Sequence, residues 1–205
     1  IEALGRRALA FPCDIADKAV CQQLVDAAVK TFGRLDVLIN CAGGAPLKGI
    51  DEWSDDDWRW IIGLNLEAVW NLSHMAASAM LATDKPGSKG AIVNISSGAS
   101  LKAMPMSPIY AAAKAGVNSL TASLAAAWTP KGVRVNAIAV GAVRAPTLTD
   151  ELDRLGIDHD KMGKGNALGR LGEPEEIGAG ALFFASDMAS FCSGQTLLMH
   201  GGPVG

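Results

Sequence analysis

Short apolar runs alternate with longer amphipathic stretches along almost the whole chain. The apolar runs predict strands at residues 7–13, 35–39, 91–95, 133–140 and 195–199, and the continuous run 35–39 is typical of a strand buried on both faces. Helical spacing of apolar positions predicts helices over residues 16–32, 55–80, 107–128 and 173–188. Strands that alternate with helices indicate crossover connections. The pattern therefore predicts one α/β domain over residues 1–205, a doubly wound parallel sheet with helices on both faces.

Residues at the ends of the predicted helices support these boundaries. Ser54 is a good N-cap for the second helix, and Ser107 followed by Pro108 suits the start of the third. Gly33 ends the first helix. Asp14 can cap that helix near Ala16, contact a ligand, or do both.

Polar residues follow the predicted strands at their carboxyl ends, where ligands bind in open parallel sheets. They are Asp14, Asn40, Ser96, Ser97 and Gly141. We expect the four strand ends to line one crevice. Residues 144–172 have a weaker pattern and frequent glycine, which predicts a mobile excursion on the same side.

Composition excludes several classes of function. The net charge is −3 with no basic run, which argues against a nucleic-acid partner. The longest apolar helical run is too short to span a membrane. The four cysteines show no disulfide framework, so we interpret them as reduced thiols of a cytoplasmic protein. The three histidines have no metal-ligand spacing, so no metal site is expected.

Tyr110 and Lys114 lie four residues apart in the predicted helix 107–128, so they share one face of it. A phenol with a pKa near 10 is a poor acid or base at neutral pH, and a neighbouring ammonium lowers that pKa. The pair is thus a candidate acid–base group. A tyrosine and a lysine at this spacing are a weak signal alone, so the surrounding motifs decide.

Those motifs together resemble the short-chain dehydrogenase/reductase family from about residue 7 to residue 202. The matching segments are Asn40-Cys41-Ala42-Gly43, Asn65, Ser97, the Tyr110–Lys114 pair, NAIAVGAV at 136–143, GRLGEPEEIGAGALFFASD at 169–187 and GQTLLMHGG at 194–202. The resemblance implies a Rossmann-like fold and NAD(P)-dependent interconversion of a secondary alcohol and a ketone by hydride transfer.

The resemblance also implies four catalytic roles. Tyr110 would be the general acid or base. Lys114 would lower the pKa of Tyr110 and bind the nicotinamide ribose, and Ser97 would hold the substrate oxygen. Asn65 would fix a water that links Lys114 to solvent, or would be a satisfied amide in helix packing.

The implied cofactor is NAD or NADP. The positions that match the family's cofactor site are Asp14 and Ile15 at the adenine, Asn40, Ala42 and Gly43 along the ribose and diphosphate, Tyr110 and Lys114 at the nicotinamide ribose, and Gly141 to Val143 at the carboxamide.

The sequence departs from the family pattern in two respects. Cys41, Val140, Ala145 and His200 replace common family residues, and Thr147 is a candidate substitute for the threonine missing at 145. No phosphate-binding TGxxxGxG loop occurs in the 205 residues. We therefore expect the first βαβ unit to be missing, an unpaired strand at 7–13, an open edge at 35–39, and weak or absent cofactor binding by this chain alone.

Substrate and assembly stay open at this point. The chain resembles the 3-oxoacyl-carrier-protein reductases and the sugar or polyol dehydrogenases equally, with a small alcohol or ketone bound by Leu101, Met104 and residues 145–166. Lys114 argues against halohydrin dehalogenases, which carry arginine there. A non-catalytic binding or scaffold protein is the alternative. A homotetramer pairing through helices 55–80 and 107–128 is expected, with Trp53, Trp58, Trp60 and Trp70 packing helices or that interface.

Overall fold

Four parallel strands form the centre of the molecule. The computed structural model describes residues 1–84 and 87–203. The strands are β1 (Val37–Asn40), β2 (Gly90–Ser97), β3 (Val133–Val140) and β4 (Thr196–Met199), in the spatial order β1-β2-β3-β4. The pairings are parallel throughout, which aligns Ser97 with Val140 and Val140 with Met199 at one edge. The predicted α/β class with a parallel sheet is confirmed.

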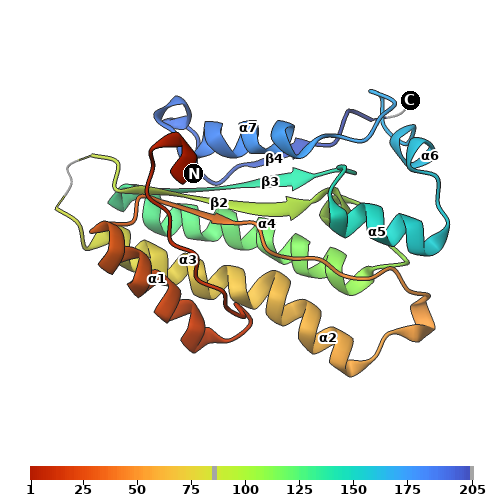
Figure 1. Cartoon of the computed structure of the whole chain (residues 1–205), viewed down its shortest axis with the longest axis horizontal. Helices are drawn as coiled ribbons and strands as arrows, with labels where there is room; N and C mark the ends of the chain where they lie inside the picture. Colours follow the sequence, from red (N-terminus) through yellow and green to blue (C-terminus); the bar gives the residue numbers. More distant parts are fainter. Residues whose placement is uncertain (85–86, 204–205) are drawn as a thin grey trace.

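Helices cover both faces of this sheet (Figure 1). α3 (Ala68–Leu81) and α4 (Pro108–Trp128) pack on one face, α7 (Pro174–Ala185) packs on the other, and α1 (Lys18–Phe32) packs against α3. Successive strand residues point to opposite faces. Ile92 accordingly joins the core beneath α3 and α4, whereas Val93 joins the core beneath α7. None of the described helices is long and apolar enough to cross a membrane.

The predicted helix 55–80 is continuous but changes its winding in the middle. α2 (Asp55–Ile62) runs into a π-helical turn, η3 (Gly63–Glu67), and then into α3. Ser54 caps α2 by accepting a hydrogen bond from Asp57 N, as predicted. Single π turns inside α-helices occur frequently at functional sites. Asn65 lies in this one.

The predicted start of the first helix is wrong by two residues, and the predicted start of the third is confirmed at Ser107 and Pro108 without the expected capping bond. α1 begins at Lys18 and is capped by the Asp17 side chain, while Asp14 Oδ1 accepts from Ala16 N just before the helix. Ser107 stands at the N-cap of α4, but its side chain makes no capping bond and instead donates weakly to Pro46 O at 3.5 Å. Local propensity thus located the start of α4 but not which oxygen bonds there, because Ser107 is drawn to Pro46 O instead of its own helix.

Residues 144–172 contain two helices that the weak sequence pattern did not predict. They are α5 (Pro146–Leu155) and α6 (His159–Gly163). α5 has proline in its first turn and ends at Gly156, whose φ is 65°. Proline at the start and glycine just past the end are helix signals that could have located it. Short turns complete the chain at η1 (Glu2–Leu4), η2 (Ile50–Glu52), η4 (Gly98–Leu101), η5 (Thr129–Lys131) and η6 (Asp187–Ala189).

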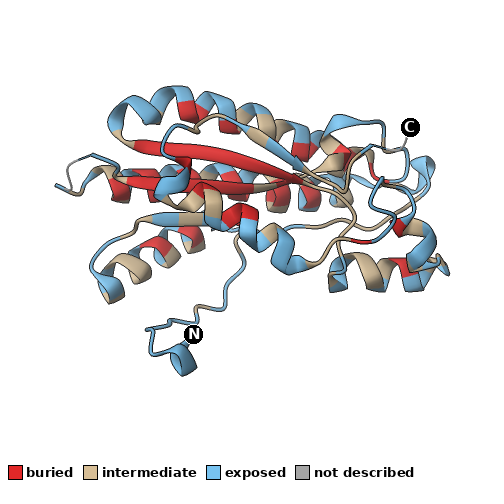
Figure 2. Cartoon of the chain, turned by 90° about the horizontal axis from the view of Figure 1, so that it is seen from above, coloured by how far each residue is buried: buried red, intermediate tan, exposed pale blue. Residues whose placement is uncertain are grey.

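The predicted strand at residues 7–13 is wrong. The segment forms no strand, and all but one of its residues are exposed (Figure 2). A strand needs a neighbour for its backbone hydrogen bonds, and β1, the end strand of the described sheet, pairs only with β2. Burial of 35–39 on both faces is also wrong, because Val37 and Ile39 are 36% and 45% exposed. The expected open edge at this strand is what the structure has.

Candidate active site

The carboxyl ends of β2 and β3 and the first turns of α4 meet in one place. A Cβ on Gly98, directly after β2, would lie 3.5 Å from Val140 O at the end of β3. Ser96 Oγ donates to Lys114 O at 3.1 Å, which ties the end of β2 to α4. The sheet edge and the helix that carries Tyr110 are therefore fixed relative to each other by packing and by a buried hydrogen bond.

Lys114 is a buried ammonium group at this junction. Its residue is only 3% exposed, and Nζ donates to Ile95 O at 2.9 Å. Burial lowers the pKa of Lys114 to about 8, against a smaller opposing effect of Cys41. Nζ lies 5.6 Å from the centroid of the Tyr110 ring. The structure thus brings the two residues together on one face of α4.

Tyr110 has its pKa raised above the ordinary value of 10. Burial is the main cause, and a hydrogen bond with Ser97 opposes it. The expected lowering by Lys114 is not found: the causes of the Tyr110 pKa shift are burial and the Ser97 hydrogen bond, and Lys114 is not among them. A raised pKa keeps the phenol protonated at neutral pH.

Ser97 has two contacts at the end of β2. Its hydroxyl interacts with Tyr110, and Oγ accepts a hydrogen bond from Ala99 N at 3.1 Å, which caps η4. Ser100 Oγ in turn donates to Ser97 O and accepts from Asn118 Nδ2 at 2.8 Å. The Ser97 hydroxyl is therefore both oriented by the backbone and directed at the phenol.

The side-chain amide of Asn65 forms hydrogen bonds with the main chain. Nδ2 donates to Gly44 O at 2.9 Å and to Ile61 O at 3.0 Å, and Oδ1 accepts from Gly44 N at 3.0 Å. Both N–H groups are occupied, so the side chain is a satisfied buried amide, the second of its two expected roles. It holds the chain at Gly44 next to the π turn. Only a lone pair of Oδ1 is left for the expected water.

The residues after β1 form the adjacent part of the site. Asn40 turns its side chain inward, where Nδ2 donates to Ser73 Oγ and Asn94 Oδ1. Ala42 and Gly43 are exposed. A Cβ at Gly43 would lie 2.7 Å from Asn65 Oδ1 and 3.2 Å from Lys114 Nζ. The bare main chain at Gly43 thus lies directly beside the buried lysine.

The remaining predicted positions divide into two groups. Gly141 N donates to Met199 O at 2.9 Å, and Val143 forms an isolated parallel bridge with Gly172, so both belong to the same edge of the sheet. Asp14 is exposed, and Ile15 packs with the cluster of Cys21, Val25 and Leu72. The described segment before Asp14 forms no strand, so three of the four expected strand ends are present, at β1, β2 and β3.

Sequence reasoning missed the contacts of residues 46–48. Their backbone groups bind side chains or backbone of α5 and of the segment before α4. Contacts between a backbone and a side chain about a hundred positions away leave no periodic pattern, so only the weak acidic–basic spacing of Glu151 and Arg154 was visible.

The donor groups fit a nicotinamide dinucleotide. Gly43 presents exposed main chain where a Cβ would collide with Asn65, which suits close approach of a ribose or phosphate. Lys114 has three N–H groups, and Ile95 O takes one of them. A buried ammonium beside a phenol and a serine hydroxyl suits sugar hydroxyls and a carbonyl oxygen.

Comparison with known proteins gives the class. The family model described as enoyl-(acyl carrier protein) reductase matches residues 1–203. D-threitol dehydrogenase of Mycolicibacterium smegmatis is 37% identical over 198 residues, covering 94% of this chain and 72% of that protein. L-rhamnose 1-dehydrogenase (NAD(P)(+)) of Sphingomonas is 36% identical over 205 residues, covering 98% and 78%. The solved structure of ElxO with NADP bound has a TM-score of 0.85 and 30% identity, covering 93% of this chain and 76% of that one.

The chain belongs to the short-chain dehydrogenase/reductase family. It is an NAD(P)-dependent oxidoreductase that interconverts an alcohol and a ketone.

Proposed function

We propose that Tyr110 is the general acid and base of this reaction. In reduction its hydroxyl protonates the carbonyl oxygen, and in oxidation its deprotonated form, the phenolate, accepts the alcohol proton. The observation that carries the proposal is the group formed by buried Lys114 with half-buried Tyr110 and Ser97 at the end of β2. Burial holds the Tyr110 pKa above 10, so the phenol keeps the proton that reduction consumes.

Ser97 and Lys114 assist by position and charge. The Ser97 hydroxyl, oriented by Ala99 N, donates to the oxygen on which charge develops. Lys114 keeps two N–H groups beyond its bond to Ile95 O, and these hold the cofactor ribose and place a positive charge under the Tyr110 ring. NAD(P), when bound, supplies or accepts the hydride.

The chain also positions the cofactor through its main chain. Exposed backbone at Ala42 and Gly43 holds the ribose and diphosphate, with Asn40 fixing the strand end from the interior. Gly141 to Val143 hold the carboxamide side. Asp14 and Ile15, one exposed and one packed at the start of α1, take the adenine end.

The substrate class that fits best is a sugar or polyol. Support comes from the named relatives, which include a D-threitol and an L-rhamnose dehydrogenase. The second candidate is an acyl-carrier-protein thioester, which the description of the matching family model favours. Assaying D-threitol, L-rhamnose and a 3-oxoacyl thioester with both cofactors distinguishes the two, because the preferred substrate gives the highest kcat/KM.

The Tyr110→Phe variant tests the catalytic proposal. We expect kcat to fall about 10³-fold while cofactor binding and the melting temperature stay close to wild type, because only one hydroxyl is removed. Ser97→Ala should lower kcat as well, whereas its matched control Ser123→Ala, on the exposed side of α4, should not. Turnover retained by Tyr110→Phe contradicts the proposal and favours the non-catalytic scaffold.

The assembly we propose is a homotetramer that pairs through the helices at 55–80 and 107–128. Support comes from the outer side of these helices, where Trp58, Trp60 and Trp70 are 44–52% exposed and α4 presents Ala112, Ala115 and Ala122. Small side chains allow helices to approach closely. Light scattering would give the mass, and a monomer at micromolar concentration would contradict the proposal. A cytoplasmic location is proposed from the free state of all four cysteines.

A further inference from the structure

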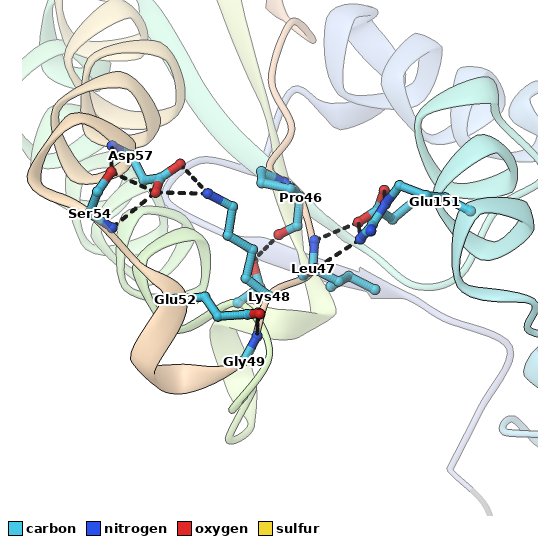
Figure 3. Close-up of polar contacts among 10 residues, drawn as sticks. Pro46, Leu47, Lys48, Gly49, Glu52, Ser54, Asp57 and Glu151 are labelled. Carbon is cyan, nitrogen blue, oxygen red and sulfur yellow. Dashed lines mark hydrogen bonds and ion pairs between the residues drawn. The ribbon is translucent and has the colours of Figure 1, made fainter.

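The loop of residues 44–49, which follows β1, is bound by four different parts of the chain, and Figure 3 shows the contacts of its residues Pro46 to Gly49. At its start, both backbone groups of Gly44 bond to Asn65 in the π turn. Toward its end, Lys48 Nζ contacts both carboxylate oxygens of Asp57 on α2, at 2.7 and 2.8 Å. The middle of the loop contacts α5 and the segment before α4.

Leu47 is held by both of its backbone groups to one ion pair on α5. Leu47 N–H donates to Glu151 Oε1 at 2.7 Å, and Arg154 Nη2 donates to Leu47 O at 2.9 Å. Arg154 also forms a two-point contact with Glu151, through Nε to Oε2 at 2.8 Å and through Nη2 to Oε1 at 2.6 Å. The pair therefore gives the Leu47 backbone one acceptor, Glu151, and one donor, Arg154, as a neighbouring β-strand would.

A third residue on the same face of α5, Thr147, also lies against the loop. Thr147, Glu151 and Arg154 are spaced by four and three residues, so they lie on one side of the helix. A Cβ at Gly44 would lie 3.1 Å from Thr147 Cγ2. α5 thus runs along the loop from the position next to Asn65 to Leu47.

On its other side, the loop contacts the segment that leads into α4. Lys48 N donates to Met106 O at 3.0 Å, and Ser107 Oγ donates to Pro46 O at 3.5 Å. Met106 and Ser107 directly precede the first turn of α4, which carries Tyr110. The loop therefore connects α5 with the start of the helix that bears the proposed acid.

Glu151 is the more buried partner, with a side chain 16% exposed against 54% for Arg154. The hydrogen bond from Arg154, aided by the one from Leu47 N–H, lowers the pKa of Glu151 to about 2, so the acceptor stays charged at neutral pH. An exposed ion pair within one helix stabilises little by itself. Because both residues also hydrogen-bond to the Leu47 backbone, this pair connects α5 to another segment.

We propose that Glu151 and Arg154 are positioning residues that fix α5 as a wall of the reaction site by holding Leu47, and that they thereby set the affinity for cofactor and substrate. The inference rests on the Tyr110-centred function proposed above. Neither side chain takes part in proton or hydride transfer, so the effect belongs in binding and not in the chemical step.

Steady-state kinetics and cofactor binding test this role. For Glu151→Ala we expect KM for the alcohol and Kd for NADP or NAD to rise about tenfold, with kcat within about twofold of wild type, because uniform binding is lost. Glu151→Gln should recover much of the affinity, since its amide oxygen still accepts the Leu47 N–H. Arg154→Ala should resemble Glu151→Ala.

Two controls separate the effect of the hydrogen bonds to Leu47 from the effect of the ion pair itself. The double variant Glu151→Arg, Arg154→Glu restores an ion pair on α5 but places no acceptor at Leu47 N–H, so we expect it to behave as Glu151→Ala. Arg59→Ala removes the exposed pair with Asp56 on α2, which has the same spacing and no contact with the loop. That variant should match wild type.

Amide hydrogen exchange provides a readout that does not need activity. The Leu47 amide should exchange faster in Glu151→Ala and in the double variant than in wild type. Unchanged exchange at Leu47, unchanged KM and Kd in Glu151→Ala, or wild-type affinity in the double variant would each overturn the inference. The proposed chemistry fails separately, through turnover retained by Tyr110→Phe.

Discussion

The carboxyl ends of β2 and β3 and the exposed edge at β1 differ in how many neighbours each strand has. β2 and β3 each pair on two sides and lie between helix layers, and Ile92, Val93 and Val135 are fully buried. β1 pairs on one side, and residues 7–13 form no strand pairing among the described residues. The proposed reacting group lies where the enclosed strand β2 meets α4, and burial there shifts the pKa of Tyr110 and of Lys114. Enclosure therefore provides both the rigidity and the chemistry of the site.

The largest expected effect compares the same residue type in the two regions. Ile92→Ala in β2 should lower the free energy of unfolding by about 2–5 kcal/mol, because it leaves a cavity between α3, α4 and the sheet. Ile39→Ala in β1, 45% exposed, should cost below about 1 kcal/mol. Urea denaturation measures both. Equal losses would show that β1 is as enclosed as β2.

A smaller effect is expected where the two regions meet, at Gly43. A methyl group there would lie 2.7 Å from Asn65 Oδ1 and 3.2 Å from Lys114 Nζ, so both side chains must shift. We expect Gly43→Ala to lower kcat/KM about tenfold or more.

The matched control for Gly43→Ala is Gly178→Ala, at an exposed position of α7, where nothing lies within 4 Å of the new methyl. It should keep full activity and gain up to about 1 kcal/mol of stability. Full activity in Gly43→Ala would contradict the tight junction of loop, π turn and lysine.

The cost of burying Lys114 should appear as a dependence of stability on pH. Its folded pKa is about 8 and its ordinary value is 10.5, so between these values the unfolded chain binds more protons than the folded one. Stability from this group therefore rises with pH, by about 2 kcal/mol between pH 8 and 10. Unfolding curves at several pH values measure it. Lys114→Met should remove the rise, and an identical slope in that variant would assign the rise to other groups.

The sequence predicted most of the fold where local patterns and tertiary neighbours agree. The runs at 91–95 and 133–140 became β2 and β3 because each has a strand on both sides. The equally apolar run at 7–13 did not become a strand, since strand formation depends on a partner that no local pattern reveals. The prediction that a first βαβ unit is missing, and with it strong cofactor binding, stays a prediction.

The candidate site was predictable in its residues but not in its energetics. Helical spacing placed Tyr110 and Lys114 on one face, and the family resemblance added Ser97. The direction of the Tyr110 pKa was wrong, since burial arises from packing of α4 against β2 and η4. The hydrogen bonds of Glu151 and Arg154 with Leu47 join residues about a hundred positions apart in the sequence, so no local pattern indicates them.

One measurement tests the central claim, that enclosure keeps the proposed acid protonated. Tyr110 is the only tyrosine in the sequence, so the ultraviolet absorbance of phenolate reports its ionisation alone. We predict that it titrates above pH 10 in the folded protein and returns to about 10 when urea unfolds the chain. A folded-state pKa at or below 10 would contradict the account, because the charge of Lys114 would then outweigh burial.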